Sequence, residues 1–282
     1  MKDFENSFSL TINNHKVNYT DEGKYGAPVI IFIHGFPFNM SMWNRQVESL
    51  RNYCRVITYD IRGFGNSDAG TEDFTVDLFA KDLISLMDAL KIEKTIVCGL
   101  SLGGYIALNA YKNYPGRFSA LILSDTTCKA DTSEAKEKRI KAIENIKTNG
   151  AEKYADESIK NLFAPESFNN KVKEIDAARE MIMKTPVQSL CKGLFALSVR
   201  TETCSILKKI NLPVLILVGE EDIITPPAAA KFMHDKIKSS ILEVLEHAGH
   251  LSNMENSEVF NNHLMRFIEF IHDESLPQDL NK

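Results

Sequence analysis

The chain has 282 residues, of which 44% are hydrophobic and 25% charged, a composition typical of a globular protein with a sizeable core. Its formal net charge of -5 at pH 7 argues against nucleic acid as a partner, because phosphate binding needs a basic face. No apolar run approaches the length of a membrane span. The start of the chain carries acids and lacks the apolar stretch of a secretory signal.

The cysteines are few and scattered. Their odd number, and the lack of any C-x-x-C pair, predict reduced thiols rather than a disulfide framework or a zinc site. Reduced thiols and the absence of a signal predict a cytoplasmic protein. The oligomeric state stays open, with a homodimer as one possibility. The cysteines are Cys54, Cys98, Cys128, Cys191 and Cys204.

The first predicted elements are two strands. Apolar residues alternate from Phe8 to Ile12 and from Val17 to Tyr19, on either side of a pair of asparagines, which predicts a β-hairpin. Beyond Pro28 the pattern changes to short continuous apolar runs, which are typical of strands covered on both faces. These six runs are residues 29–33, 55–59, 95–100, 119–124, 214–219 and 241–246.

Segments whose apolar residues recur with the period of a helix lie between these runs and after the last one. In residues 74–91 the apolar positions recur every three or four residues, so one face of a helix is predicted to be buried. Residues 102–111 and 257–271 show the same period. Because strand and helix alternate, the sequence predicts an α/β fold, an open doubly wound sheet that is mostly parallel. In such a sheet the ligand site lies at the carboxyl ends of the strands.

One segment interrupts the alternation. Between about Thr126 and Cys204 no strand is predicted, whereas helices are expected in residues 131–150, 172–184 and 187–199. We therefore expect a helical cap that lies over the carboxyl edge of the sheet. The predicted organisation is a first part of the core in residues 1–125, the cap in 126–205, and a second part of the core in 206–282.

The segment KTIVCGLSLGGYIAL, residues 94–108, places Ser101 in the pattern G-x-S-x-G. Chance produces this pattern about once in ten chains of this length, so its position matters more than its letters. A strand precedes Ser101 and a helix follows it, which is the arrangement of a nucleophile elbow, and Gly99 and Gly103 permit its tight turn. The main rival is a phosphate-binding loop, but position 101 is not the glycine that the pattern G-x-G-x-x-G needs, and no lysine follows as in a Walker loop.

A serine hydroxyl becomes a strong nucleophile only when a base removes its proton, and the base needs a carboxylate to orient it. In this arrangement the chain order is serine, acid, histidine, with both partners on loops that follow strands. After the fifth run the loop offers Glu220, Glu221 and Asp222 as the acid. After the sixth run it offers His247 and His250 as the base. Spacing alone leaves these alternatives open.

Essentially the whole chain resembles the α/β-hydrolase fold family, with an eight-stranded sheet and a helical cap. The resemblance implies that Asp222 is the acid and His250 the base, with Asp125 as a reserve acid because some relatives carry the carboxylate at that position. The segments that carry the resemblance are HGFPFNMSMW (34–43), YDIRGFGNSD (59–68), GLSLGG (99–104), GEEDIITPP (219–227) and HAGHLSNMENSEVF (247–260).

The resemblance also implies an oxyanion hole, formed by the backbone N–H groups of Phe36 and Leu102. Removing one such donor typically costs roughly 3–4 kcal/mol of transition-state stabilisation. His34 is expected to shape the loop of Phe36 rather than to transfer protons. A serine at position 101 argues against the relatives that open epoxides or displace halide, because those use a carboxylate nucleophile.

The sequence therefore predicts a serine hydrolase that cleaves a small carboxylic ester or lactone through an acyl-enzyme, with a small-molecule acyl substrate and no metal or organic cofactor. It most resembles small carboxylesterases and 3-oxoadipate enol-lactonase-type hydrolases. A C–C bond hydrolase and a cofactor-free haloperoxidase or perhydrolase are alternatives. A small-molecule receptor that retains the triad is an alternative of another class. Substrate preference is expected to lie in cap residues, which the sequence does not separate from residues that pack the cap.

Overall fold

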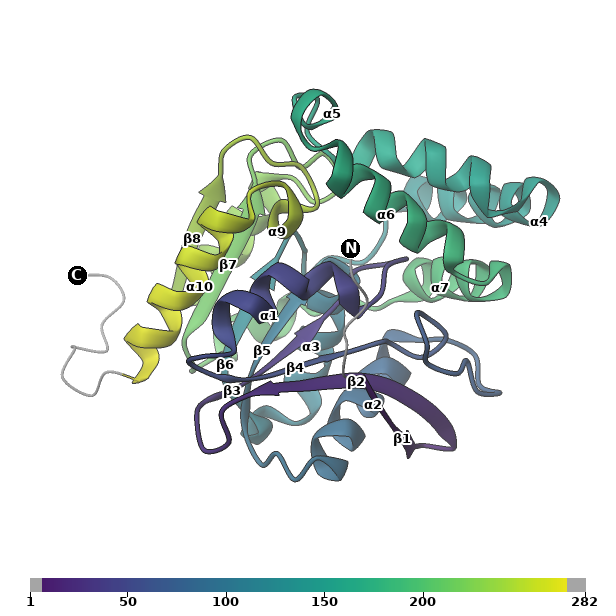
Figure 1. The fold of residues 1–282 in the computed structure, drawn as a ribbon. Helices are drawn as coiled ribbons and strands as arrows, with labels where there is room; N and C mark the ends of the chain where they lie inside the picture. The colour runs from purple at the N-terminus through teal and green to yellow at the C-terminus, as the bar shows by residue number, and fades with distance from the viewer. Residues whose placement is uncertain (1–6, 273–282) are drawn as a thin grey trace.

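The computed structural model describes residues 7–272 of the protein (Figure 1). The first six residues, on which part of the argument against a secretory signal rests, lie outside this range. The described residues form one eight-stranded sheet, as the resemblance predicted. The strands are β1 (Phe8–Ile12), β2 (His15–Gly23), β3 (Val29–Ile33), β4 (Arg55–Tyr59), β5 (Thr95–Leu100), β6 (Phe118–Ser124), β7 (Val214–Gly219) and β8 (Ser240–Leu245).

The sheet is mostly parallel. Its strand order is β1-β2-β4-β3-β5-β6-β7-β8, and β2 runs antiparallel to both of its neighbours, while the other neighbouring pairs are parallel. The predicted hairpin joins β1 to β2, and Asn13 and Asn14 both adopt positive φ, as a two-residue hairpin turn requires. The buried strands β3 to β7 bring their carboxyl ends to one edge of the sheet.

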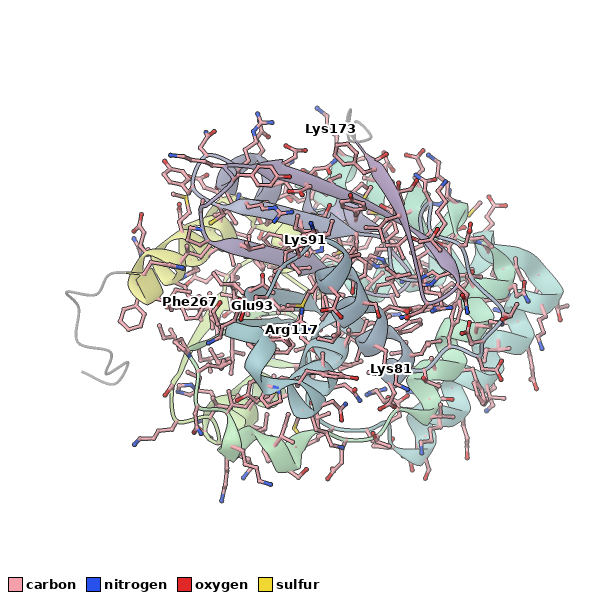
Figure 2. The ribbon with its side chains drawn as sticks, turned by 90° about the horizontal axis from the view of Figure 1, so that it is seen from below. Lys81, Lys91, Glu93, Arg117, Lys173 and Phe267 are labelled. Carbon is pink, nitrogen blue, oxygen red and sulfur yellow. A yellow bond between two sulfur atoms is a disulfide. The ribbon has the colours of Figure 1, made fainter. Side chains whose placement is uncertain are left out.

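Helices cover both faces of the sheet. One hydrophobic core lies between the sheet and α2, α3 and α8, and a second lies between the opposite face and α1 and α10. Figure 2 views the protein from below, with α2 and α3 in front and exposed Lys81, Lys91 and Glu93 at the surface. These helices are α1 (Asn44–Leu50), α2 (Val76–Ala89), α3 (Leu102–Asn113), α8 (Pro227–His234), α9 (Ser252–Glu255) and α10 (Ser257–His272); short 3₁₀ turns are η1 (Met40–Trp43), η2 (Pro115–Arg117) and η3 (Cys204–Lys209).

The inserted segment, residues 126–205, contains four helices between β6 and β7, which lie together above the strand ends in Figure 1. They are α4 (Ser133–Leu162), α5 (Ser167–Asn170), α6 (Val172–Lys184) and α7 (Val187–Val199). The helix predicted to end near residue 150 instead continues to Leu162, with a kink at Gly150, where φ is 79°. The assignment of this segment to a separate cap domain remains a proposal.

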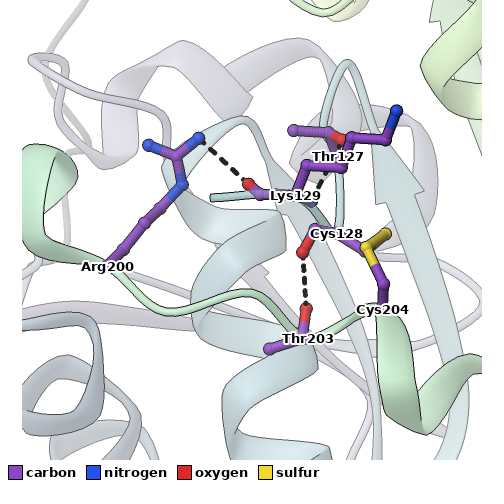
Figure 3. The surroundings of a disulfide bond; sticks show 6 residues. All are labelled: Thr127, Cys128, Lys129, Arg200, Thr203 and Cys204. Carbon is purple, nitrogen blue, oxygen red and sulfur yellow. Dashed lines mark hydrogen bonds between the residues drawn. A yellow bond between two sulfur atoms is a disulfide. The ribbon is translucent and has the colours of Figure 1, made fainter. Parts of the chain in front are cut away.

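The prediction of five reduced thiols is wrong for two cysteines. Cys128 and Cys204 form a disulfide, with Cα atoms 4.9 Å apart and a sequence separation of 76 (Figure 3). The pairing arises because β6 and β7 are neighbours, so the two ends of the inserted segment meet beside them. The thiol argument for a cytoplasmic location therefore fails. Cys54, Cys98 and Cys191 are free.

No helix within residues 7–272 is both long and apolar enough to cross a bilayer. In the same residues, no group of three or more His, Cys, Asp or Glu side chains is placed to hold a metal ion.

Candidate active site

Ser101 occupies a sharp turn between β5 and α3. Its backbone has φ 53° and ψ -110°, a conformation that is uncommon for a residue with a side chain and is typical of a nucleophile elbow. A Cβ atom at Gly99 would lie 2.2 Å from the carbonyl oxygen of Gly103, and one at Gly103 would lie 2.2 Å from that of Ile33. The structure thus confirms the prediction that glycines at 99 and 103 permit the close approach of strand and helix.

The start of α3 and the loop after β3 lie against each other at Ser101. Leu102 is the first residue of α3, so its N–H belongs to the group at a helix start that has no partner within the helix. Phe36 lies in the loop after β3 and lines the same cavity as Ser101. This places both predicted oxyanion donors on segments that adjoin the serine.

His34 is part of the framework of that loop. The Ile61 N–H donates to His34 Nε2 at 2.9 Å, so Nδ1 carries the proton and donates to the Gly35 carbonyl oxygen, also at 2.9 Å. Burial lowers the pKa of His34 to about 4, although the bond to Gly35 raises it slightly. A neutral imidazole with both nitrogens bonded to backbone shapes the loop, in agreement with the expectation from sequence.

Asp222 and His250 form a buried hydrogen-bonded pair. His250 Nδ1 lies 2.8 Å from Asp222 Oδ2, and the two residues are 3% and 2% exposed. Asp222 also accepts hydrogen bonds from the Ile224 N–H at 2.8 Å and from the Thr225 hydroxyl at 2.7 Å. These donors hold the carboxylate in place, and the Nδ1 bond leaves Nε2 as the ring nitrogen that can act as a base.

The pair stabilises its own charges. Burial raises the pKa of Asp222, but the charge and hydrogen bond of His250, with the hydrogen bonds from Thr225, outweigh burial and hold the pKa below its ordinary value. Burial lowers the pKa of His250, but the charge and hydrogen bond of Asp222 outweigh it and raise the pKa above 6.5. The arrangement therefore suits an ionised carboxylate that supports an imidazolium.

Asp125, the reserve acid, lies between the same loops but has other partners. Its carboxylate accepts hydrogen bonds from the Gly219 N–H at 2.9 Å, the Ser124 hydroxyl at 2.7 Å and the Ser252 hydroxyl at 2.5 Å. Burial and the charge of Asp222 raise the pKa of Asp125 to about 7. Because Asp222 bonds the imidazole and Asp125 does not, the geometry favours Asp222 as the orienting acid.

The other sequence candidates lie apart from the imidazole. Glu220 and Glu221 are exposed. His247 is also exposed, and its Nδ1 lies 3.0 Å from Glu166, a residue of the inserted segment. The geometry therefore favours Asp222 and His250 over these alternatives.

Sequence reasoning missed a third buried carboxylate near the histidine, that of Glu255. Glu255 accepts hydrogen bonds from the N–H groups of Gly249 and Ala164, each at 2.8 Å, and from the Ser167 hydroxyl at 2.6 Å. It lies five residues after His250, within the segment 247–260, whose resemblance to the family did not indicate a role for this residue. Only the fold shows that two of these partners, Ala164 and Ser167, belong to the inserted segment.

A cavity of about 550 Å³ lies between the core and the inserted segment. Ser101 and His250 both line it, together with Phe36 and Thr225. Its size is in the range of sites for small molecules. The inserted segment contributes apolar side chains such as Leu194, and also charged side chains that the sequence did not single out as functional: Asp131, Lys138, Arg139 and Arg200.

Several known proteins are similar to this chain over most of its length. The chain is 31% identical over 253 residues to 3-oxoadipate enol-lactonase 1 of Acinetobacter baylyi, covering 88% of this chain and 91% of that protein. It is 29% identical over 256 residues to 3-oxoadipate enol-lactonase 2 of the same organism, covering 90% and 93%.

A solved thermophilic esterase from Thermogutta terrifontis superposes with a TM-score of 0.89 and 32% identity, covering 95% of this chain and 99% of that one. A family model described as the alpha/beta hydrolase fold matches residues 28–257. The eight-stranded sheet, the serine elbow and this match show that the chain belongs to the α/β-hydrolase fold family.

Proposed function

We propose that the protein hydrolyses a small carboxylic ester or lactone, with Ser101, His250 and Asp222 as its catalytic triad. The observation that carries the proposal is the buried Asp222–His250 hydrogen bond of 2.8 Å at a cavity that Ser101 also lines. The relatives named above support ester and lactone chemistry, since they are called enol-lactonases and an esterase. Ser101, at a strained turn before a helix, has the position of the nucleophile.

The reaction would begin with attack of Ser101 Oγ on the substrate carbonyl carbon while His250 Nε2 accepts the hydroxyl proton. The tetrahedral intermediate then collapses and the C–O bond breaks. His250 returns the proton to the leaving alkoxide, which in a lactone stays attached to the acyl chain. A water molecule attacks the acyl-serine, His250 accepts its proton, and Ser101 regains a proton as the carboxylic acid leaves.

The oxyanion that forms in each half of the reaction would meet the N–H groups of Leu102 and Phe36. Both belong to backbone fixed by close packing, since Gly103 lies against the end of β3. Donors that are already oriented need no reorganisation when charge develops, which is the usual source of their large effect. No cofactor takes part in this scheme.

The inserted segment, residues 126–205, is proposed to act as a cap that shapes the acyl site. Its side chains form much of the wall of the cavity that Ser101 also lines. A cytoplasmic location and a homodimer remain predictions. Mass measurement of alkylated protein from the host cytoplasm would test whether Cys128 and Cys204 are reduced there, and light scattering would give the oligomeric state.

The function is tested with p-nitrophenyl esters of graded acyl length, a set of lactones, and one ring-cleavage diketone. We expect steady-state turnover of esters or lactones that is lost in Ser101→Ala and kept in Ser85→Ala, a substitution on α2 away from the cavity. Turnover of the diketone alone would identify a C–C bond hydrolase instead. A single turnover coupled to binding of a partner protein would favour the receptor.

A further inference from the structure

Asp125 is a buried carboxylate that the proposed reaction does not use directly. It follows the last residue of β6, and 0% of its surface is exposed. Its φ is 44°, in the left-handed region that residues with a side chain seldom adopt. Burying a charge and straining the backbone both oppose folding, and such features persist mainly where neighbouring contacts require them, as in functional sites. The contacts of Asp125 therefore indicate what it does.

Asp125 supports the acid loop, residues 219–225, which carries Asp222. Its Oδ1 accepts a 2.9 Å hydrogen bond from the N–H of Gly219, the last residue of β7. The backbone N–H of Asp125 donates to the carbonyl oxygen of Leu217, in the same strand, also at 2.9 Å. The start of the acid loop is therefore bound to Asp125 through both its side chain and its backbone.

The same carboxylate supports the base loop, residues 246–252, which carries His250. Oδ2 of Asp125 accepts a 2.5 Å hydrogen bond from the hydroxyl of Ser252, two residues after the imidazole. The hydroxyl of Ser124 donates to the same oxygen at 2.7 Å. Because one carboxylate binds both loops, its position affects the distance between the proposed acid and the proposed base.

The acid loop and the base loop also pack closely against each other. A Cβ atom at Gly219 would lie 2.1 Å from the carbonyl oxygen of Gly249. The Glu221 N–H donates to the carbonyl oxygen of Ala248 at 2.9 Å. Since the loops touch through their backbones, a shift of the acid loop at its contact with Asp125 would move the base loop as well.

Asp125 also acts on the imidazole through its charge. Burial and the charge of Asp222 raise the pKa of Asp125 to about 7, while the charge of His250 lowers it. The effect is mutual: burial lowers the pKa of His250, whereas the charges of Asp222, Asp125 and Glu255 raise it. An ionised Asp125 therefore stabilises the imidazolium that forms when His250 accepts a proton.

We propose that Asp125 is a positioning residue for the triad, whose carboxylate sets the spacing of the acid loop and the base loop and stabilises the imidazolium form of His250. This inference rests on the proposed function of Ser101. It gives Asp125 a role different from that of a reserve acid. Asp222 orients the imidazole by a direct hydrogen bond, whereas Asp125 acts through the two loops and through its charge.

The test compares Asp125→Asn with a matched control, Asp60→Asn, which removes another buried carboxylate. Asp60 is 1% exposed, and its hydrogen bonds come from the side chain of Asn18 and the N–H groups of Met40 and Asn66, outside the two loops. The measured quantities are kcat, KM and the pH dependence of kcat/KM with p-nitrophenyl acetate. NMR titration of the His250 imidazole gives a readout that does not depend on activity.

We expect kcat of Asp125→Asn to fall about 10- to 100-fold, the usual effect of a displaced catalytic group. KM should change little, because Asp125 does not line the cavity. Loss of a charge that raises the pKa of His250 should move the pH profile and the NMR titration to lower pH, whereas Asp60→Asn should leave both in place. Damage to the fold alone would lower kcat without moving the titration.

Ser252→Ala separates the two parts of the role. It removes the bond between Asp125 and the base loop but keeps the carboxylate, so kcat should fall while the pH profile does not move to lower pH. This variant loses a single hydroxyl, and it tests the inference even if Asp125→Asn does not fold.

The inference is overturned if the titration of His250 in Asp125→Asn coincides with that of the unmodified protein, or if Asp60→Asn moves it equally. An unchanged kcat in Ser252→Ala would also overturn it, since the bond to the base loop would then position nothing. Each of these outcomes leaves turnover dependent on Ser101. If Ser101→Ala hydrolyses the ester as fast as the unmodified protein, the proposed function itself fails.

Discussion

The backbone N–H of His250 donates a 2.9 Å hydrogen bond to the carbonyl oxygen of Leu162. Leu162 is the last residue of α4, so the loop that carries the proposed base is joined directly to the inserted segment. Glu255 makes the same connection a second time, since it accepts hydrogen bonds from Gly249 on one side and Ala164 on the other. The position of the imidazole therefore depends on the position of the inserted helices.

Glu255→Ala is expected to weaken both stability and catalysis. The substitution leaves the N–H groups of Gly249 and Ala164 and the hydroxyl of Ser167 without their acceptor in a buried site. Breaking such a network costs about 3–5 kcal/mol, measured as the free energy of unfolding in urea. We also expect a lower kcat at temperatures where the variant is folded. Glu258→Ala, at an exposed position of α10, is the control. An unchanged urea midpoint would rule out this role for Glu255.

The pH dependence follows from the pKa of His250. The base must be neutral to accept the proton of Ser101, so kcat/KM should rise with pH through the pKa of the imidazole in the free enzyme. Burial lowers this pKa, and the charge and hydrogen bond of Asp222 raise it by more, to a value above 6.5. The half-maximal rate is therefore expected above pH 6.5. A rate that stays constant down to pH 4 contradicts the scheme.

Asp222→Asn tests whether the carboxylate of Asp222 raises the pKa of His250. The substitution removes the carboxylate charge that raises the pKa of His250, whereas burial still lowers it. The pKa of His250 should therefore fall, and the pH profile should move to lower pH. The amide also favours the wrong tautomer of the imidazole, and kcat should drop by about 10³- to 10⁴-fold. Glu221→Gln, which alters an exposed neighbour, should leave the profile in place. A profile of Asp222→Asn that coincides with that of the unmodified protein would show that another group sets the pKa.

The sheet was predictable because its signals are local. A strand that is buried on both faces appears in the sequence as a continuous apolar run. Four of the strands, β3, β4, β5 and β7, have the predicted bounds. The length of α4 was not predictable in the same way, because Gly150 has the features of a helix end. Its φ of 79° is indeed that of a residue after a helix, but the chain resumes a helix beyond it. Packing of the second half of α4 against the core, at Ala155 and Ile159, compensates for the break.

Chain order, strand ends and family resemblance predicted Asp222 as the acid and His250 as the base. Their side chains lie 2.8 Å apart in the structure, and their catalytic roles stay a prediction. Contacts between distant segments were not predictable. The partners of Glu255 in the inserted segment lie about 90 residues away, at sequence separations of 91 and 88, and no periodicity indicates such a pairing. The same is true of Cys128 and Cys204, since nothing in the spacing of five cysteines indicates which two meet.

The disulfide is expected to contribute strongly to stability. It closes a loop across 76 residues of sequence, and the chain-entropy model gives about 4 kcal/mol for a loop of this size. The double variant Cys128→Ala/Cys204→Ala should therefore unfold at a lower urea concentration, and dithiothreitol should lower the midpoint of the unmodified protein in the same way. Cys191→Ala, which removes a free thiol, is the control. If the reductant leaves the midpoint of the unmodified protein unchanged, the bond does not stabilise it.

In Gly103→Ala, helix propensity and packing have opposite effects on the stability of the protein. In an isolated helix, alanine at this position of α3 would be more stable than glycine by about 1 kcal/mol. Here the added Cβ would lie 2.2 Å from the carbonyl oxygen of Ile33, a backbone atom of β3 that cannot rotate away. We expect packing to dominate, with a net loss of about 2–4 kcal/mol in the free energy of unfolding.

The clash should also move the start of α3, and with it the N–H of Leu102, so kcat is expected to fall by 10-fold or more, at roughly 1.4 kcal/mol per factor of ten. Gly116→Ala is the control, because no atom beyond its two chain neighbours lies within 4 Å of a Cβ built there. It should change the urea midpoint and kcat little. If Gly103→Ala behaves like Gly116→Ala, strand and helix can separate without cost, and the tight elbow is not what positions Ser101.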